Sequence, residues 1–184
     1  MKVFVTGGTG FIGLPLVQHL LELGADVTVL VRTPSSPAAQ SLVQLGAKLA
    51  QGDVQKPETM RPPMQQAEVF IHNAGMYEYG VTKAAAQNMQ QVNVQGTRNA
   101  LELALEAGVK KSVYVSTTIA YGASQNEPRD ETYRRSTVYG SHYERTKTEA
   151  HRVALEMQAR GLPLTIVCPN AVVGANDHNM FGYL

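Results

Sequence analysis

The first thirteen residues hold the feature that most constrains the fold, a β-prone segment that runs directly into regularly spaced glycines. Residues 3–6 suit a strand, Gly7, Gly10 and Gly13 follow, and an apolar helical pattern begins at Phe11. This order indicates a strand, a tight turn and a helix. The first glycine permits the turn, the second lets the backbone approach a pyrophosphate, and the third allows close packing of the helix. Free N–H groups at such a helix start point toward phosphates, so the stretch predicts a dinucleotide-binding turn.

The composition narrows the class of protein. With 43% hydrophobic and 17% charged residues, the 184-residue chain matches ordinary globular proteins and is long enough for one domain with a good core. Its 16 basic and 15 acidic residues give a net charge of +1 without a basic stripe, which disfavours nucleic acid and membranes as partners. A single cysteine, Cys168, excludes an internal disulfide. Because no signal peptide or long apolar run is recognised, we expect a cytoplasmic enzyme.

Strand and helix patterns alternate along the whole chain. Strands are expected at residues 3–6, 25–31, 47–50, 68–72, 112–116 and 164–168. Helices are expected at residues 11–23, 36–45, 82–107 and 141–160, with a further short helix that begins at Pro57 and that Pro62 and Pro63 must end. Residues 122–138 are polar and irregular. The alternation predicts one α/β domain over residues 1–184, with a parallel sheet and right-handed crossovers.

A second chemical signal lies on the last predicted helix. Tyr143 and Lys147 are four residues apart, so they share one helix face. An ammonium near a phenol favours the phenolate, which makes the pair a plausible proton donor and acceptor for a carbonyl or alcohol. The same spacing also arises by chance as an exposed helix pair. The hydroxyls of Ser116, Thr117 and Thr118 end the fifth strand, where ligands of doubly wound sheets bind, and one of them is expected to complete the site.

Together these motifs resemble the extended branch of the short-chain dehydrogenase/reductase superfamily. That branch contains nucleotide-sugar epimerases and dehydratases, dihydroflavonol reductases and 3β-hydroxysteroid dehydrogenases. The resemblance covers essentially all 184 residues and implies a Rossmann-type doubly wound parallel sheet with strand order 3-2-1-4-5-6 and helices on both faces. The matching residues are Thr6, Gly7, Gly10 and Gly13; Gly52, Asp53 and Val54; His72, Asn73 and Ala74; Asn93, Val94, Gly96, Thr97 and Asn99; Val115, Ser116, Thr117, Tyr121 and Gly122; and Tyr143 with Lys147.

The resemblance implies roles for the catalytic residues. Tyr143 would be the acid/base, and Lys147 would hold the nicotinamide ribose and lower the pKa of the tyrosine. The group that binds the substrate oxygen falls on Thr117 when the motif is anchored on Tyr121 and Gly122. Ser116 and Thr118 remain alternatives.

The resemblance also implies the cofactor contacts. Asp53 would approach the adenine with Val54 beside it, and Asn73 and Ala74 would lie under the middle of the cofactor. The remaining contacts expected are Thr6, Gly7, Gly10, Phe11, Ile12, Gly13, Arg32, Gly75, Asn93, Lys147 and Pro169. The five histidines have no metal-ligand spacing, and no metal site is expected.

The residue after the second strand bears on the choice of cofactor. An NAD enzyme usually places a carboxylate there for the ribose 2′-hydroxyl. This chain has Arg32, and Asp26 lies at the wrong end of the strand. Because a guanidinium suits a 2′-phosphate, we favour NADP, with NAD as the alternative. Arg32 stacked on adenine, or merely solvated, would remove that preference.

The C-terminus departs from the extended pattern. Members of that branch continue beyond the segments at residues 168–170 and 172–174 into a smaller domain that shapes the substrate pocket, whereas this sequence stops at Leu184. We therefore expect the C-terminal substrate domain to be absent or truncated. The helices at residues 82–107 and 141–160 could form a homodimer interface, or simply cover the sheet.

Three functions remain open at this point. The first is an NADP-dependent oxidoreductase that acts on a carbonyl or secondary alcohol. The second is a nucleotide-sugar epimerase, and the third is a non-catalytic dinucleotide-binding module. Dehydration is less favoured, because sugar dehydratases of this family carry an Asp-Glu pair where this chain has Thr118 and Ile119.

Overall fold

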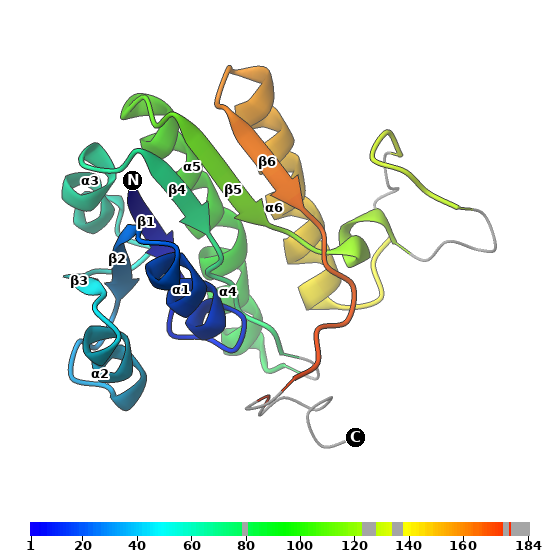
Figure 1. The fold of residues 1–184 in the computed structure, drawn as a ribbon. Helices are drawn as coiled ribbons and strands as arrows, with labels where there is room; N and C mark the ends of the chain where they lie inside the picture. Colours follow the sequence, from blue (N-terminus) through cyan, green and yellow to red (C-terminus); the bar gives the residue numbers. More distant parts are fainter. Residues whose placement is uncertain (79–80, 123–127, 134–137, 175–176, 178–184) are drawn as a thin grey trace.

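The computed structural model describes residues 1–78, 81–122, 128–133, 138–174 and 177. Its centre is a six-stranded parallel sheet in the order β3-β2-β1-β4-β5-β6 (Figure 1). The strands are β1 (Lys2–Thr6), β2 (Asp26–Val31), β3 (Lys48–Gln51), β4 (Val69–His72), β5 (Lys111–Val115) and β6 (Leu164–Val167). This confirms the expected α/β class and strand order.

Helices cover both faces of this sheet, as expected (Figure 1). The helices are α1 (Gly13–Glu22), α2 (Pro37–Gln44), α3 (Pro57–Gln65), α4 (Lys83–Gln90), α5 (Gly96–Glu106) and α6 (His142–Ala159). Successive side chains of β1 point to opposite faces. Val3 and Val5 pack with Val17 of α1, whereas Phe4 packs in a second core with residues of α3, α5 and α6. The two cores hold the strands in one register and place their carboxyl ends along one edge.

The prediction that Pro62 and Pro63 end the third helix is wrong. Helix α3 runs through both prolines to Gln65. The prolines remove two backbone donors, but Met60 and Met64 are fully buried on one face of this helix. Their burial against the core stabilises the last turn despite the lost hydrogen bonds, because tertiary packing outweighs local propensity.

The long helix expected at residues 82–107 is present with an irregularity. Thr82 caps it through its side chain, and the helix continues as α4, the π-helical turn η1 (Gln91–Gln95) and α5. A π-turn inserts one extra residue and often occurs at functional sites. Here it contains Asn93, whose side chain is 1% exposed. The sequence pattern did not indicate this turn.

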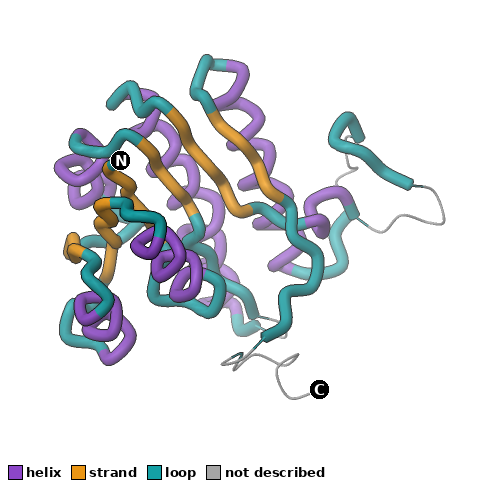
Figure 2. Tube along the Cα trace, in the orientation of Figure 1, coloured by secondary structure: helices purple, strands orange, loops and turns teal. Residues whose placement is uncertain are grey.

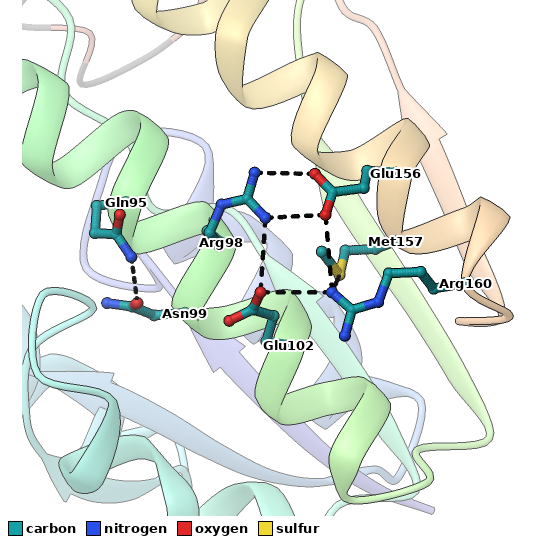
Figure 3. A network of polar contacts seen from close by, with 7 residues as sticks. All are labelled: Gln95, Arg98, Asn99, Glu102, Glu156, Met157 and Arg160. Carbon is teal, nitrogen blue, oxygen red and sulfur yellow. Dashed lines mark hydrogen bonds and ion pairs between the residues drawn. The ribbon is translucent and has the colours of Figure 1, made fainter.

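Helices α5 and α6 are joined by a network of ion pairs on their outer side (Figure 3). Arg98 makes two parallel hydrogen bonds to Glu156, at 3.1 and 2.9 Å. Glu102 is 3.5 Å from Arg160 and 3.6 Å from Arg98. These partly exposed pairs link two helices whose buried faces already pack in one core.

The loops that follow the strands gather at the carboxyl edge of the sheet (Figure 2). Among them is the short 3-10 turn η2 (Thr118–Tyr121) after β5. The described part of the segment at residues 122–138 contains no helix or strand, and residues 123–127 and 134–137 lie outside the description. No helix in the described part of the chain is long and apolar enough to cross a membrane.

Candidate functional site

A cleft of about 1210 Å³ opens at the carboxyl edge of the sheet. Residues that follow all six strands line it, as expected for a doubly wound sheet. Of the predicted site residues, the lining includes Gly7, Gly10, Phe11, Ile12, Arg32, Asp53, Val54, Asn73, Ala74, Gly75, Ser116, Thr117, Tyr143, Lys147 and Pro169. Thr6, Gly13 and Asn93 lie behind this wall and do not line the cleft.

Glycine is required at the three positions of the first turn for different structural reasons. Gly7 has a φ of 73°, and a Cβ there would lie 2.6 Å from the Ala74 nitrogen. A Cβ on Gly13 would lie 2.0 Å from the Gly7 carbonyl oxygen. Packing of the protein itself therefore requires both. At Gly10 a Cβ would meet only the Gly7 oxygen, at 3.4 Å, so protein packing does not explain this glycine. Its backbone lines the cleft, where a side chain would project toward a ligand.

The loop after β4 is held against the glycine turn from two sides. The side-chain amide of Asn73 donates to the Gly7 carbonyl (3.2 Å), and the Ala74 N–H donates to the Thr6 hydroxyl (3.4 Å). Asn93 accepts from the Met76 N–H (2.7 Å) and donates to the Met76 carbonyl (2.9 Å). The side chain of Asn93 thus fixes the cleft wall from behind.

At the other end of the cleft, Arg32 follows β2 and is exposed. Its guanidinium makes no hydrogen bond or ion pair with any described residue. Asp26 pairs with Lys48 at 2.8 Å, at the far end of the same strand. Asp53 accepts the Gln55 N–H through its side chain (2.9 Å). An uncompensated positive charge therefore lies on this part of the cleft wall.

Helix α6 brings Tyr143 and Lys147 to the cleft. The ring of Tyr143 packs edge-on against Tyr77, with centroids 4.7 Å apart. Lys147 is only 6% exposed, and its ammonium donates to the Val115 carbonyl (3.2 Å) and the Tyr114 hydroxyl (3.4 Å). Burial lowers the pKa of Lys147 to about 8, because desolvation disfavours the charged form.

The three hydroxyls after β5 have different partners. Ser116 is 2.9 Å from Nδ1 of His151, and both side chains are buried. Thr118 donates its proton to Oδ1 of Asn170 (3.2 Å). Thr117 accepts from the Ile119 N–H (3.3 Å), and its own proton has no acceptor among the described residues. Thr117 is thus the hydroxyl whose proton is available at the cleft wall.

Sequence reasoning missed a buried polar layer beneath the cleft. Nδ1 of His72 forms a hydrogen bond with the Thr6 hydroxyl (2.7 Å), and Nε2 forms one with the Thr97 hydroxyl (3.0 Å). The ring of Tyr114 stacks on the His72 ring. The available signal was a histidine at the end of an otherwise apolar strand. Sequence reasoning also missed apolar residues of the cleft wall, which include Met76, Tyr77, Ile119, Ala171 and Val172.

The fold and the cleft define a Rossmann-type α/β domain whose site lies at the carboxyl ends of its strands. The model of the NAD dependent epimerase/dehydratase family matches residues 3–183. The chain belongs to this family, whose members are enzymes.

Three related proteins illustrate the range of the family. The 4-hydroxy-2-methyl-3-oxo-4-farnesyl-3,4-dihydroquinoline-1-oxide ketoreductase of Stigmatella aurantiaca is 32% identical, over 96% of this chain and 52% of its own. The 3-beta-hydroxysteroid dehydrogenase of Mycolicibacterium neoaurum is 30% identical, over 98% of this chain and 50% of its own. The UDP-glucose 4-epimerase of Bifidobacterium longum, solved in complex with NAD+ and UDP, aligns with a TM-score of 0.76 and 26% identity, over 91% of this chain and 52% of its own. The chain spans about half the length of these proteins.

Proposed function

We propose that this chain forms the cofactor half of an NADP-dependent oxidoreductase that interconverts a carbonyl and a secondary alcohol. The observation that carries the proposal is that Tyr143, Lys147 and Thr117 line the same cleft as the glycine turn. This cavity thus holds a phenol, an ammonium one helical turn further along α6, a threonine hydroxyl and the turn that we assign to the cofactor phosphates. That combination suits reduction of a carbonyl better than simple ligand binding.

The residues present fit a dinucleotide. The backbone at Gly10 is open to the cleft, where a methyl group would occupy the space for a pyrophosphate. Asp53 and Val54 would hold the adenine, Asn73 and Ala74 the middle of the cofactor, and Lys147 the nicotinamide ribose. When bound, the nicotinamide supplies or accepts a hydride.

Arg32 supports NADP over NAD. It follows β2, three strand positions from β5, which corresponds to roughly 14 Å along the sheet. The two ends of the cleft are therefore the ends expected for adenine ribose and nicotinamide. An exposed guanidinium that has no partner among the described residues is suited to a 2′-phosphate. The carboxylate of β2, Asp26, pairs with Lys48 at the far end of the strand and is not placed to bind the NAD ribose.

The charge of the cleft wall supports an uncharged substrate. Arg32 and Lys147 are the basic side chains of the described lining, and we assign both to the cofactor. The remaining charged groups there are carboxylates, of Asp53, Glu78, Glu144 and Asp177. A nucleotide diphosphate would lack a cation in this part of the chain. A nucleotide-sugar epimerase is the second candidate, because the epimerase of Bifidobacterium longum shares the fold at 26% identity.

Proton transfer in the proposed reaction uses three side chains. Thr117 donates a hydrogen bond to the substrate oxygen, and Tyr143 gives that oxygen its proton during reduction. The Lys147 ammonium, one turn further along α6, favours the phenolate that remains. With a pKa of about 8, Lys147 is charged at neutral pH and loses its charge above that value.

The direct test is titration of the chain with NADPH and NADH, followed by NADPH oxidation with a panel of aldehydes and ketones. We expect tighter binding of NADPH and oxidation that Tyr143→Phe abolishes. Tyr139→Phe removes a phenol that hydrogen-bonds Arg152 outside the cleft and is the matched control. Tighter binding of NADH would refute the choice of NADP. Undiminished oxidation in Tyr143→Phe would refute the catalytic assignment.

A further inference from the structure

The ammonium of Lys147 lies in an unusual environment for a charged group. Lys147 is 6% exposed, and within the described part of the chain Nζ donates to two neutral oxygens, the Val115 carbonyl at 3.2 Å and the Tyr114 hydroxyl at 3.4 Å. No carboxylate lies within ion-pair distance of Nζ in the described structure. A buried cation of this kind depends on the lone pairs that the protein directs toward it.

The Tyr114 hydroxyl is the acceptor in its contact with Lys147. An ammonium has three N–H donors and no lone pair, so the 3.4 Å contact is a hydrogen bond from Nζ to the phenol oxygen. The Val115 carbonyl accepts a second Nζ–H at 3.2 Å. Tyr114 and Val115 therefore direct two oxygen lone pairs of β5 and its end at the ammonium.

The ring of Tyr114 is held in place by packing. It is fully buried and stacks on His72, with centroids 5.6 Å apart. Its centroid is 5.2 Å from Nζ of Lys147, within the range of a cation–π contact. Burial raises the pKa of Tyr114, so the phenol remains neutral wherever the protein works. Tyr114 thus offers Lys147 a rigid, neutral acceptor.

We propose that Tyr114 is a positioning residue that, with the Val115 carbonyl, holds the Lys147 ammonium at the floor of the cleft. A Cβ on Gly75 would lie 3.8 Å from Nζ of Lys147, so the ammonium faces the loop after β4. We assign this loop to cofactor binding. The catalytic consequence rests on the proposed function, because only there does the charge of Lys147 act on Tyr143. The hydrogen bond itself does not depend on it.

The experiment is a pH titration of the lysine side chains by ¹³C NMR at Cε, with Lys147 assigned by loss of its signal in Lys147→Arg. Removal of the acceptor in Tyr114→Phe should lower the pKa of Lys147 by about one unit or more, a ten-fold change in its protonation constant. Tyr139→Phe is the matched control. Its phenol accepts a hydrogen bond from Arg152 outside the cleft, and the variant should leave the midpoint unchanged. The titratable groups that face Lys147 from other elements are Tyr114, His72 and Cys168.

A second measurement keeps the test decisive if Tyr114→Phe does not fold. In the wild-type chain, the Tyr114 Cζ resonance should move with the same midpoint as Lys147 Cε, because its oxygen accepts from Nζ. The proposal would be overturned if folded Tyr114→Phe kept the wild-type Lys147 midpoint. It would also be overturned if the Tyr114 Cζ chemical shift stayed constant while Lys147 titrates. Neither measurement needs cofactor or turnover, so failure of the proposed function gives a different result. With turnover, Tyr114→Phe should move the pH midpoint of alcohol oxidation upward.

Discussion

His72 and Thr97 share a hydrogen bond of 3.0 Å beneath the cleft, and both side chains are at most 1% exposed. Because Thr97 gives its proton to the Asn93 carbonyl, Nε2 of His72 must be the donor. Nδ1 is then an acceptor, and Thr6 donates to it across 2.7 Å. The histidine is therefore neutral, and a second proton would leave Nδ1 and the Thr6 hydroxyl as opposed donors.

This pairing makes stability depend on pH. Burial, and secondarily the charge of Lys147, lowers the pKa of His72 to about 3, whereas an unfolded histidine titrates near 6.5. The unfolded chain therefore binds a proton that the folded chain does not. The contribution of His72 to the free energy of unfolding is fully retained above pH 6.5 and falls as the pH drops toward 3, by about 1.4 kcal/mol per pH unit.

Urea unfolding between pH 7 and 5 measures this effect, because the carboxylates with lowered pKa titrate below that window. His72→Gln keeps a donor for Thr97 but cannot gain a charge, so its stability should vary less over this range. His19→Gln alters an exposed histidine on α1 and should keep the wild-type slope. An equal slope in wild type and His72→Gln would contradict the assignment.

The glycine turn offers a matched pair of substitutions that separates folding from binding. Gly13→Ala places a methyl group 2.0 Å from the Gly7 carbonyl and should destabilise the fold by about 1–3 kcal/mol or more. Gly10→Ala meets only an ordinary contact at 3.4 Å, and its stability should stay within about 1 kcal/mol of wild type. Because its methyl group enters the proposed pyrophosphate site, NADPH affinity should fall about ten-fold or more.

Thermal unfolding and NADPH titration of both variants provide the check. A stable Gly10→Ala variant with unchanged affinity would show that the turn does not contact the cofactor. A Gly13→Ala variant as stable as wild type would mean that the first turn of α1 moves to accommodate the methyl group.

The sheet could be predicted from sequence because its signals are local. Each buried strand is a short apolar run, and a glycine in the left-handed region, such as Gly24, Gly46 or Gly108, ends the preceding helix. The end of α3 was predicted wrongly at Pro62 and Pro63 because a tertiary contact, not a local signal, determines it. Proline is a local signal to stop, but the anchoring of Met64 in the core is a tertiary effect that no local pattern reveals.

The position of the candidate site could be predicted from the topology of the sheet, but the hydrogen-bond partners of its side chains could not. Residues after parallel strands must meet at one edge, so the sequence could bring Arg32 and Thr117 to a common cleft. It could not assign partners, because these come from distant elements. Asn93 holds Met76 from the π-turn, and Ser116 meets His151 from α6, separations of 17 and 35 residues.

Removal of the Arg32 guanidinium tests the proposed cofactor preference. Because Arg32 has no partner in the part of the chain that the structure describes, Arg32→Ala should leave stability unchanged while NADPH affinity falls about ten-fold or more. NADH lacks the 2′-phosphate, so its affinity should change little. Arg61→Ala removes an exposed arginine that pairs with Glu106 and is the control for loss of one positive charge. Isothermal titration with both cofactors measures the change, and equal losses for NADPH and NADH would indicate stacking on adenine instead.

The last prediction concerns which of the three hydroxyls serves the substrate. Thr117→Val keeps the shape of the side chain but removes the hydroxyl proton, which has no acceptor among the residues that the structure describes. We expect turnover to fall about 100-fold, because one donor to a developing oxyanion is lost. Thr117→Ser keeps the hydroxyl and should retain most activity. The contrast between the two substitutions therefore isolates the proton from the packing of the side chain.

Variants at the neighbouring positions complete the comparison. Thr118→Val deletes a hydroxyl whose proton already binds Asn170, and Ser116→Ala deletes the partner of His151. Thr118→Val should therefore lower kcat less than Thr117→Val does. Ser116→Ala should chiefly reduce thermal stability, since it leaves a buried ring nitrogen without its partner. If Ser116→Ala lost the most turnover at an unchanged melting temperature, the substrate would have to displace His151, and Thr117 would not be the substrate-binding hydroxyl.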